Sequence, residues 1–290
     1  MVMKELNIPE PFKMDQVELL QEGIYDDPQI NVYINMQKDF AFLYPRPVVN
    51  YKEYLPRVKK LNLEKYKKQR LVYKERYLKI RNFINNISNL LEIGAGDGSF
   101  LRIIKENHPT VDLSAVETDI STLSQREDIE NLENYENLEE IYKHNNKYDA
   151  ICLFHVLEHI IDPSVYLSII GQLLNKNDSL VIIEVPSLFD PLLSIYGCES
   201  YRKFYFQSQH PYIYSNTSIV RLMERNGFAT KEVINYQRYG IENHLNWLAK
   251  NSPGGSEFIR NIFNKTNKSY LTELEDFGKT DTVIWIGELN

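Results

Sequence analysis

Three histidines follow or interrupt apolar segments, where an imidazole can take part in chemistry. His155 and His159 come after the apolar run 150–154, and His210 lies in an aromatic stretch further along the chain. A neutral histidine accepts a proton near pH 7, so each is a candidate base for a reaction in which an oxygen or nitrogen loses a proton. A hydrogen-bonded structural histidine is the alternative. We favour His210, ahead of His159 and His155, as the catalytic residue.

A glycine-rich turn follows an apolar run and precedes a helical pattern in residues 90–101, which read LLEIGAGDGSFL. Glycine is needed where φ is positive or where a side chain would collide with a ligand, and the following helix places unpaired N–H groups near the turn. Dinucleotide-binding folds use G-x-G-x-x-G, which requires a glycine at position 99. That position is Ser99, so an NAD-dependent dehydrogenase fits poorly.

A carboxylate lies where a second ligand contact is expected. Glu117 ends the next apolar run, nineteen positions beyond Gly98. A carboxylate at this place can accept hydrogen bonds from both ribose hydroxyls in adenosine-binding α/β folds. Asp119 is the nearby competitor for this role.

The sequence from residue 85 onward alternates strand-length apolar runs with helix-length amphipathic segments. This alternation is typical of a parallel sheet covered by helices on both faces. We therefore predict an α/β fold with strands at 90–95, 111–117, 134–138, 149–154, 179–185, 231–236 and 282–287. The expected helices are 99–107, 163–174 and 217–226. The candidate histidines would then lie near the open edge of the sheet.

Residues 1–84 are expected to form a helical cap. Five prolines interrupt residues 1–50, which we expect to be loosely organised. In residues 54–84 apolar and aromatic residues recur every three or four positions, which predicts amphipathic helices. Residues 51–81 also hold twelve Lys or Arg and three Glu. A solvated helix face is the commoner explanation of such a segment, and a site for an anionic substrate or acidic partner is the alternative.

The composition is that of a globular protein, with 43 % hydrophobic and 25 % charged residues in a chain of 290. The net charge of -7 argues against generic nucleic-acid binding. Cys152 and Cys198 lack the spacing of a structural metal site, and we expect no metal. Because no apolar run is long enough to span a bilayer and no signal pattern opens the chain, we expect a cytoplasmic protein.

The motifs together resemble those of class I methyltransferases that use S-adenosylmethionine (SAM). They are E-x-G-x-G-x-G at 92–98, the carboxylate at 117 and H-x-L-E-H at 155–159, and the resemblance covers about residues 70–236 and the last strand. It implies a Rossmann-like seven-stranded sheet of order 3-2-1-4-5-7-6, with an antiparallel seventh strand at 281–289. The domain would span 85–290, with lid or accessory segments at 188–214 and 239–281. SAM would be the cofactor and S-adenosylhomocysteine (SAH) its product.

The resemblance also assigns roles to individual residues. The implied cofactor contacts are Glu92, Gly94, Ala95, Gly96, Gly98, Glu117, Thr118, Phe154 and His155. The implied acceptor contacts are Glu158, Tyr205, Gln207, Tyr212 and Tyr214, although the aromatic members could instead form a packed lid. In sugar C-methyltransferases an acidic residue precedes the histidine that matches His210. This chain has Gln209 there, which favours an oxygen or nitrogen acceptor.

We therefore expect a methyltransferase that acts on a small molecule. The leading acceptor is a sugar, or a phosphorylated or nucleotide-linked precursor of a surface polysaccharide. Arg202 and Lys203, beside the aromatic stretch, would suit an anionic acceptor. The alternatives are a methyltransferase of quinone or secondary metabolism and a non-catalytic SAM-binding protein that meets a partner through its basic segment.

Overall fold

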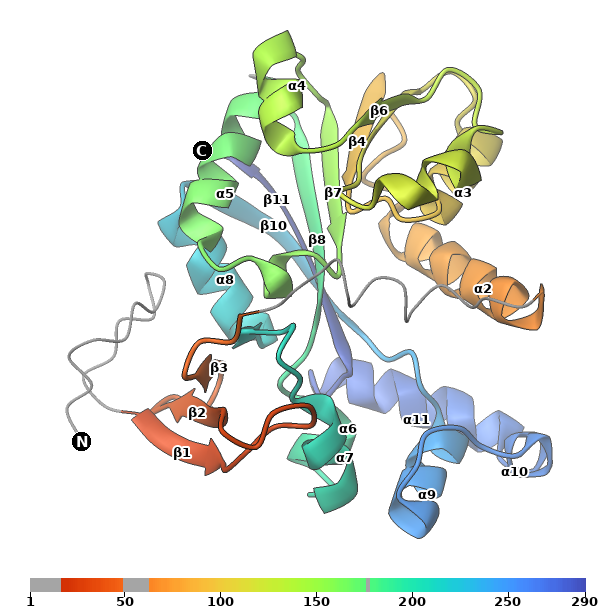
Figure 1. Cartoon of the computed structure of the whole chain (residues 1–290). Helices are drawn as coiled ribbons and strands as arrows, with labels where there is room; N and C mark the ends of the chain where they lie inside the picture. Colours follow the sequence, from red (N-terminus) through yellow and green to blue (C-terminus); the bar gives the residue numbers. More distant parts are fainter. Residues whose placement is uncertain (1–16, 49–62, 176–177) are drawn as a thin grey trace.

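A mixed sheet organises the chain, and the computed structural model describes residues 17–48, 63–175 and 178–290. The strands of this sheet are Asn89–Ile93 (β4), Asp112–Val116 (β5), Glu133–Tyr135 (β6), Ala150–Phe154 (β7), Leu180–Pro186 (β8), Phe228–Tyr236 (β10) and Thr282–Leu289 (β11). Among the described residues they are ordered β10-β11-β8-β7-β4-β5-β6, and β11 is antiparallel to both its neighbours (Figure 1). This order and the inserted last strand confirm the predicted Rossmann-like methyltransferase sheet.

Helices cover both faces of the sheet, which explains why its central strands are apolar on both sides. Leu90 and Leu91, neighbours on β4, belong to two different hydrophobic clusters, one on each face. One face is covered by α2 (Leu63–Ile80) and α3 (Ser99–Asn107), and the other by α4 (Leu138–His144), α5 (Pro163–Leu173) and α8 (Asn216–Arg225) (Figure 1).

Residues 17–48 form strands where a helical cap was predicted. β1 (Val17–Gln21), β2 (Asn31–Asn35) and β3 (Ala41–Tyr44) make an antiparallel sheet that β9 (Tyr212–Ile213) completes. The prediction was wrong here because apolar residues alternate along β2, where Val32 and Ile34 are buried and favour a strand. Helix α2 agrees with the prediction for 54–84 where that segment is described; residues 1–16 and 49–62 lie outside the described residues.

Two further groups of helices lie at the lower end of the molecule in Figure 1, where β8 leads into α6. The first group, α6 (Pro191–Ser194) and α7 (Glu199–Tyr205), follows β8. The second group, α9 (Ile241–Lys250), α10 (Glu257–Ile262) and α11 (Asn264–Asp276), connects β10 to β11. They fall in the segments 188–214 and 239–281, where accessory structure was expected. No helix in the described part of the chain is both long and apolar enough to cross a membrane.

Candidate active site

The three glycines of the turn between β4 and α3 have different structural roles. Gly94, Gly96 and Gly98 all have positive φ angles, of 77°, 52° and 74°. A Cβ on Gly94 would lie 2.5 Å from Val156, and one on Gly98 would lie 2.8 Å from Ile129. A Cβ on Gly96 would meet nothing within 4 Å. Internal packing therefore explains two of the glycines, whereas Gly96 borders open space that a ligand can use.

Glu117 reaches back to this turn. Its Oε2 accepts a hydrogen bond of 2.8 Å from the Gly96 N–H, and its Oε1 accepts one of 2.8 Å from the Asp119 N–H. Each carboxylate oxygen keeps a further lone pair for a ligand hydroxyl. Asp119 is used differently, because its Oδ1 accepts from the N–H and hydroxyl of Ser121 and so caps a short helix. This favours Glu117 over Asp119 as the ribose contact.

A cavity of about 740 Å³ opens beside the turn, and we call it the strand-edge cavity. Its polar lining includes Gly94, Glu117 and Thr118 at the ends of β4 and β5, and its apolar lining includes Val116 and Ile169. A carboxylate for ribose hydroxyls beside apolar side chains for a flat adenine suits an adenosyl group. The open space at Gly96 and the carboxylate of Glu117 therefore fit the expected cofactor.

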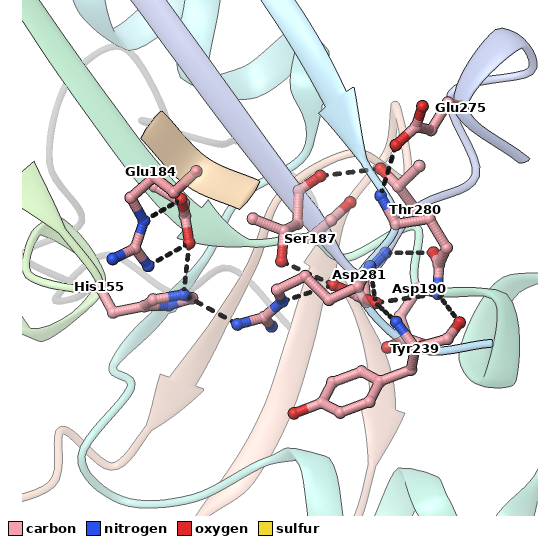
Figure 2. A network of polar contacts seen from close by, with 12 residues as sticks. His155, Glu184, Ser187, Asp190, Tyr239, Glu275, Thr280 and Asp281 are labelled. Carbon is pink, nitrogen blue, oxygen red and sulfur yellow. Dashed lines mark hydrogen bonds and ion pairs between the residues drawn. The ribbon is translucent and has the colours of Figure 1, made fainter. Parts of the chain in front are cut away.

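His155 lies between this cavity and a network of buried charges (Figure 2). Its Nδ1 is 3.2 Å from Glu158 Oε1, and its Nε2 is 2.9 Å from Glu184 Oε1. Burial alone would lower the pKa of His155, but its hydrogen bonds with these two carboxylates outweigh burial and raise that pKa. A histidine with a carboxylate at each nitrogen is held as a hydrogen-bond donor, so His155 is better suited to positioning than to accepting a proton.

Two arginines, the buried Arg76 and the partly buried Arg238, complete the network. Arg76 of α2 donates to both oxygens of Glu184, at 2.6 and 2.7 Å, and its guanidinium lies over the Phe154 ring. Burial would raise the pKa of Glu184, but the Arg76 guanidinium holds that pKa well below its usual range. Arg238 lies 3.1 Å from His155 and donates to Asp281 at 2.8 Å. Both arginines are therefore neutralised by carboxylates within the protein.

A second cavity of about 350 Å³ lies on the other side of His155, and we call it the aromatic cavity. It is lined by His155, by residues of the segment after β8, and by residues of α9 and the loop before it. Its aromatic lining includes Tyr201, Phe204, Tyr205 and Trp247. Its polar lining includes Asp190, Gln207, His210 and Arg238. Aromatic walls with a few polar groups are typical of small-molecule sites.

The other two candidate histidines meet near His155. His159 lines the strand-edge cavity, His210 lines the aromatic cavity, and their ring centroids are 4.8 Å apart. The Nδ1 of His159 is 2.7 Å from the carbonyl oxygen of Gln209, so this nitrogen carries the proton. Burial lowers the pKa of His210 to about 4, which keeps its imidazole neutral at pH 7.

The chain matches, over residues 59–233, the profile of a family described as a methyltransferase domain. The matched segment is more than half of the chain. The chain belongs to this methyltransferase family. No curated protein matches the chain.

Solved structures support the fold of the methyltransferase. A SAM-dependent methyltransferase from Archaeoglobus fulgidus is 21 % identical with a TM-score of 0.51, and the match covers 75 % of this chain and 93 % of that one. A chain in the Haloferax volcanii complex between the Trm112 methyltransferase activator and a methyltransferase is 10 % identical with a TM-score of 0.52, covering 76 % and 93 %. Family and fold together confirm the expectation of a class I enzyme with SAM as its cofactor.

The predicted cofactor residues of the methyltransferase gather at one edge of the sheet. Those that line the strand-edge cavity are Gly94, Glu117, Thr118 and His155, and those in the turn beside it are Ala95, Gly96 and Gly98. Glu92 is buried beneath the turn. Phe154 differs, because its side chain packs 4.6 Å from the Phe100 ring and under Arg76, and it is not among the lining residues.

The predicted acceptor residues divide into two groups. Tyr205 and Gln207 line the aromatic cavity. Tyr212 and Tyr214 do not line it and instead pack in the core beside Phe40, because β9 joins the N-terminal sheet there. The structure therefore corrects the expectation that these two tyrosines form an acceptor wall. Glu158 is also buried, and it contacts His155.

Sequence reasoning missed several charged residues at the site. Arg76 was counted as part of a solvated basic face, yet it is buried and paired with Glu184. One available signal was its spacing, since Arg76 is three residues from Tyr73 and four from Ile80, on the apolar face of α2. Arg238 gave no comparable local signal, because its partner Asp281 lies elsewhere in the chain. Asp190 was also missed, although it caps α6 by accepting a hydrogen bond from the Leu192 N–H.

Proposed function

We propose that the protein transfers a methyl group from SAM in the strand-edge cavity to an oxygen or nitrogen of a small molecule in the aromatic cavity. The observation that carries the proposal is that His155 lines both cavities, so a donor and an acceptor would meet beside it. SAM supplies a methyl carbon already activated by its sulfonium. The acceptor's lone pair displaces the sulfur and the acceptor loses a proton, so the protein mainly has to position the two reactants.

The roles that we propose for the residues that bind the cofactor follow from the lining of the strand-edge cavity. Glu117 binds the ribose hydroxyls, and the backbone at Gly96 allows the ligand to approach the turn closely. His155, held by Glu158 and Glu184, positions the reacting end. The segments 188–214 and 239–281 act as the lid, which is supported by their contribution to the aromatic cavity.

The aromatic cavity supports a neutral acceptor better than an anionic one. Arg238 is a positively charged residue that lines this cavity, and its charge is neutralised by the ion pair with Asp281. Arg202 and Lys203, which suggested an anionic acceptor, are not among the lining residues. We therefore propose a ring-shaped acceptor with a free hydroxyl or amine, such as a sugar. A nucleotide-linked precursor would keep its phosphates outside this cavity.

The acceptor proton is proposed to leave through the pair His159 and His210. His210 is neutral at pH 7, faces the aromatic cavity and lies against His159. A neutral imidazole facing the acceptor can take part in removing its proton. His155 is less suited, because both of its nitrogens contact carboxylates.

The test measures transfer of labelled methyl groups from SAM to panels of sugars, nucleotide sugars, quinols and amines. We expect transfer to one class. His210→Ala should lower turnover about 10²- to 10⁴-fold, the range for lost acid-base catalysis, with SAH affinity nearly unchanged. His144→Ala, on the exposed face of α4, should behave as wild type. Binding of SAH without transfer to any acceptor class would instead support the non-catalytic alternative.

The histidine variants also separate the possible roles within the cluster. Full turnover in His210→Ala combined with a loss in His159→Ala would move the proton-accepting role to His159. Full turnover in both variants would mean that catalysis is by positioning alone.

A further inference from the structure

We propose that Glu158, His159 and His210 form a binding site for one divalent transition-metal ion of the zinc type. One potential ligand atom from each residue lies within 4.8 Å of the other two. The inference rests on the proposed function for its consequence, but metal binding can be measured independently of it. It also goes against the expectation from the cysteine spacing that the protein holds no metal.

Glu158 offers a carboxylate oxygen that has no other use in the described structure. The residue is 1 % exposed, and its Oε2 has no hydrogen-bond partner among the described residues. A buried carboxylate oxygen without a partner is costly, and a metal ion is one group that satisfies it. The other oxygen, Oε1, contacts His155 Nδ1 at 3.2 Å, and this contact holds the carboxylate in place.

His159 is oriented in the way that metal-bound histidines usually are. Its Nδ1 donates to the Gln209 carbonyl oxygen at 2.7 Å, which fixes the tautomer and places the lone pair on Nε2. Gln209 is also the chain neighbour of His210, so the same short segment orients one proposed ligand and supplies another. Glu158 and His159 are thus both held by a second contact on the side away from the proposed ion.

Two imidazoles and one carboxylate are the protein ligands of a common type of catalytic zinc site, which keeps a fourth position open for water or substrate. Zinc binds such ligands at about 2.0 to 2.2 Å, so binding would draw the three side chains together by roughly an ångström. His159 and His210 line the two different cavities, which places the proposed ion between them.

An ion at this place would deepen the proposed function. An acceptor hydroxyl that displaced the ion's water would have its pKa lowered and would release its proton to solvent. Its oxygen would then attack the methyl carbon as the carbon–sulfur bond breaks and the electron pair returns to sulfur.

The test is calorimetric titration of the chelator-treated full chain with Zn²⁺, together with the visible absorption of its Co²⁺ form. Wild type and His144→Gln, an exposed-histidine control, should each bind one ion and give the intense absorption of four-coordinate Co²⁺. Glu158→Gln and His210→Gln should each weaken Zn²⁺ binding by more than the roughly 10- to 100-fold that outer contacts contribute. Circular dichroism would confirm that both ligand variants fold, and the less buried His210 gives a second readout if the Glu158 variant does not.

Failure of this proposal can be told from failure of the proposed function. No stoichiometric Zn²⁺ binding by wild type, or equal binding by His210→Gln and His144→Gln, would overturn the metal site. If methyl transfer were still lost in His210→Ala, the proposed function would stand with His210 as a base. Stoichiometric Zn²⁺ binding without transfer to any acceptor would support the site and reject the transfer.

Discussion

The strand-edge cavity and the aromatic cavity meet at His155, but they are assembled from different kinds of sequence. The strand-edge cavity takes Gly94, Glu117 and His155 from positions at or just beyond the ends of β4, β5 and β7, neighbouring parallel strands whose ends share one edge. The aromatic cavity draws on Asp190, Tyr205 and Trp247, from segments outside the parallel strands that approach one another only in the folded chain. The strand-edge cavity therefore follows from the sheet that the family shares, whereas the aromatic cavity depends on segments outside the parallel strands of this chain.

The polar groups of the two cavities differ in the same way. In the strand-edge cavity, backbone N–H groups hold the carboxylate of Glu117. Around the aromatic cavity, charged side chains hold one another, as Arg238 and Asp281 do. Backbone N–H groups hold a carboxylate wherever the turn has the correct conformation. Buried charges depend on each other, so removing one partner lowers stability. We therefore expect mutations in the strand-edge cavity to change cofactor affinity, and mutations of the charged network to change stability.

The largest expected effect is on stability, from the buried pair beside His155. Glu184→Gln leaves Arg76 buried without a charged partner, so the free energy of unfolding should fall by about 3 to 5 kcal/mol. The matched control is Glu106→Gln, which removes the exposed partner of Arg70 on the same helix and should cost at most about 1 kcal/mol. Urea denaturation measures both. Equal losses would mean that the buried ion pair contributes no more to stability than the exposed one.

The next effect is on affinity and belongs to the strand-edge cavity. Glu117→Ala should weaken SAM or SAH binding by roughly 2 to 4 kcal/mol, because two charge-assisted hydrogen bonds to ribose are lost. Asp119→Ala is the control, since Asp119 caps a helix and does not line the cavity. Calorimetry decides between them. A loss confined to the Asp119 variant would move the ribose contact by two residues.

The third effect is a pH dependence on the aromatic side. Burial, with a contribution from Asp281, raises the pKa of Asp190 to about 7. Between pH 4 and pH 7 the folded protein therefore keeps a proton on Asp190 that the unfolded chain releases. The contribution of Asp190 to stability falls as pH rises from about 4 to about 7. Asp190→Asn should remove this fall, whose slope for one proton is at most about 1.4 kcal/mol per pH unit.

Denaturation at several pH values compares wild type with Asp190→Asn and with the exposed control Asp112→Asn. The wild type and the Asp112 variant should show the same slope between pH 4 and 7. An unchanged slope in the Asp190 variant would mean that the buried carboxylate is not the group that titrates.

The sheet could be predicted because most of its strands carry their own signal, although the short β6 has no apolar run. The apolar run at β4 and the apolar run at β11 both required burial on two faces, and the family resemblance supplied their order. In the N-terminal sheet the alternation along β2 indicates a strand but does not indicate its partners. Strand β3 of this sheet pairs with β9, residues about 170 positions later, and β9 is only two residues long. Such a pairing depends on tertiary contacts that no local pattern of residues 17–48 indicates.

The candidate site was predictable to the extent that local geometry determines it. The turn and Glu117 followed from glycine spacing and from the end of a strand. Tyr212 and Tyr214 could not be placed from sequence, because an aromatic residue suits a cavity wall and a packed core equally well. Arg238 could not be recognised as neutralised, since its partner Asp281 lies 43 residues away.

The most direct test of the account is the affinity of SAH for two glycine variants, measured by calorimetry. Gly96 and Gly197 have φ angles of 52° and 57°, and a Cβ on either would meet nothing within 4 Å. Valine therefore strains the backbone similarly at both, but only at Gly96 does it enter the space proposed for the cofactor. We predict that Gly197→Val binds SAH like wild type, while Gly96→Val weakens binding by at least about 100-fold, or about 2.7 kcal/mol. Unchanged SAH affinity in a folded Gly96→Val variant would contradict the cofactor site.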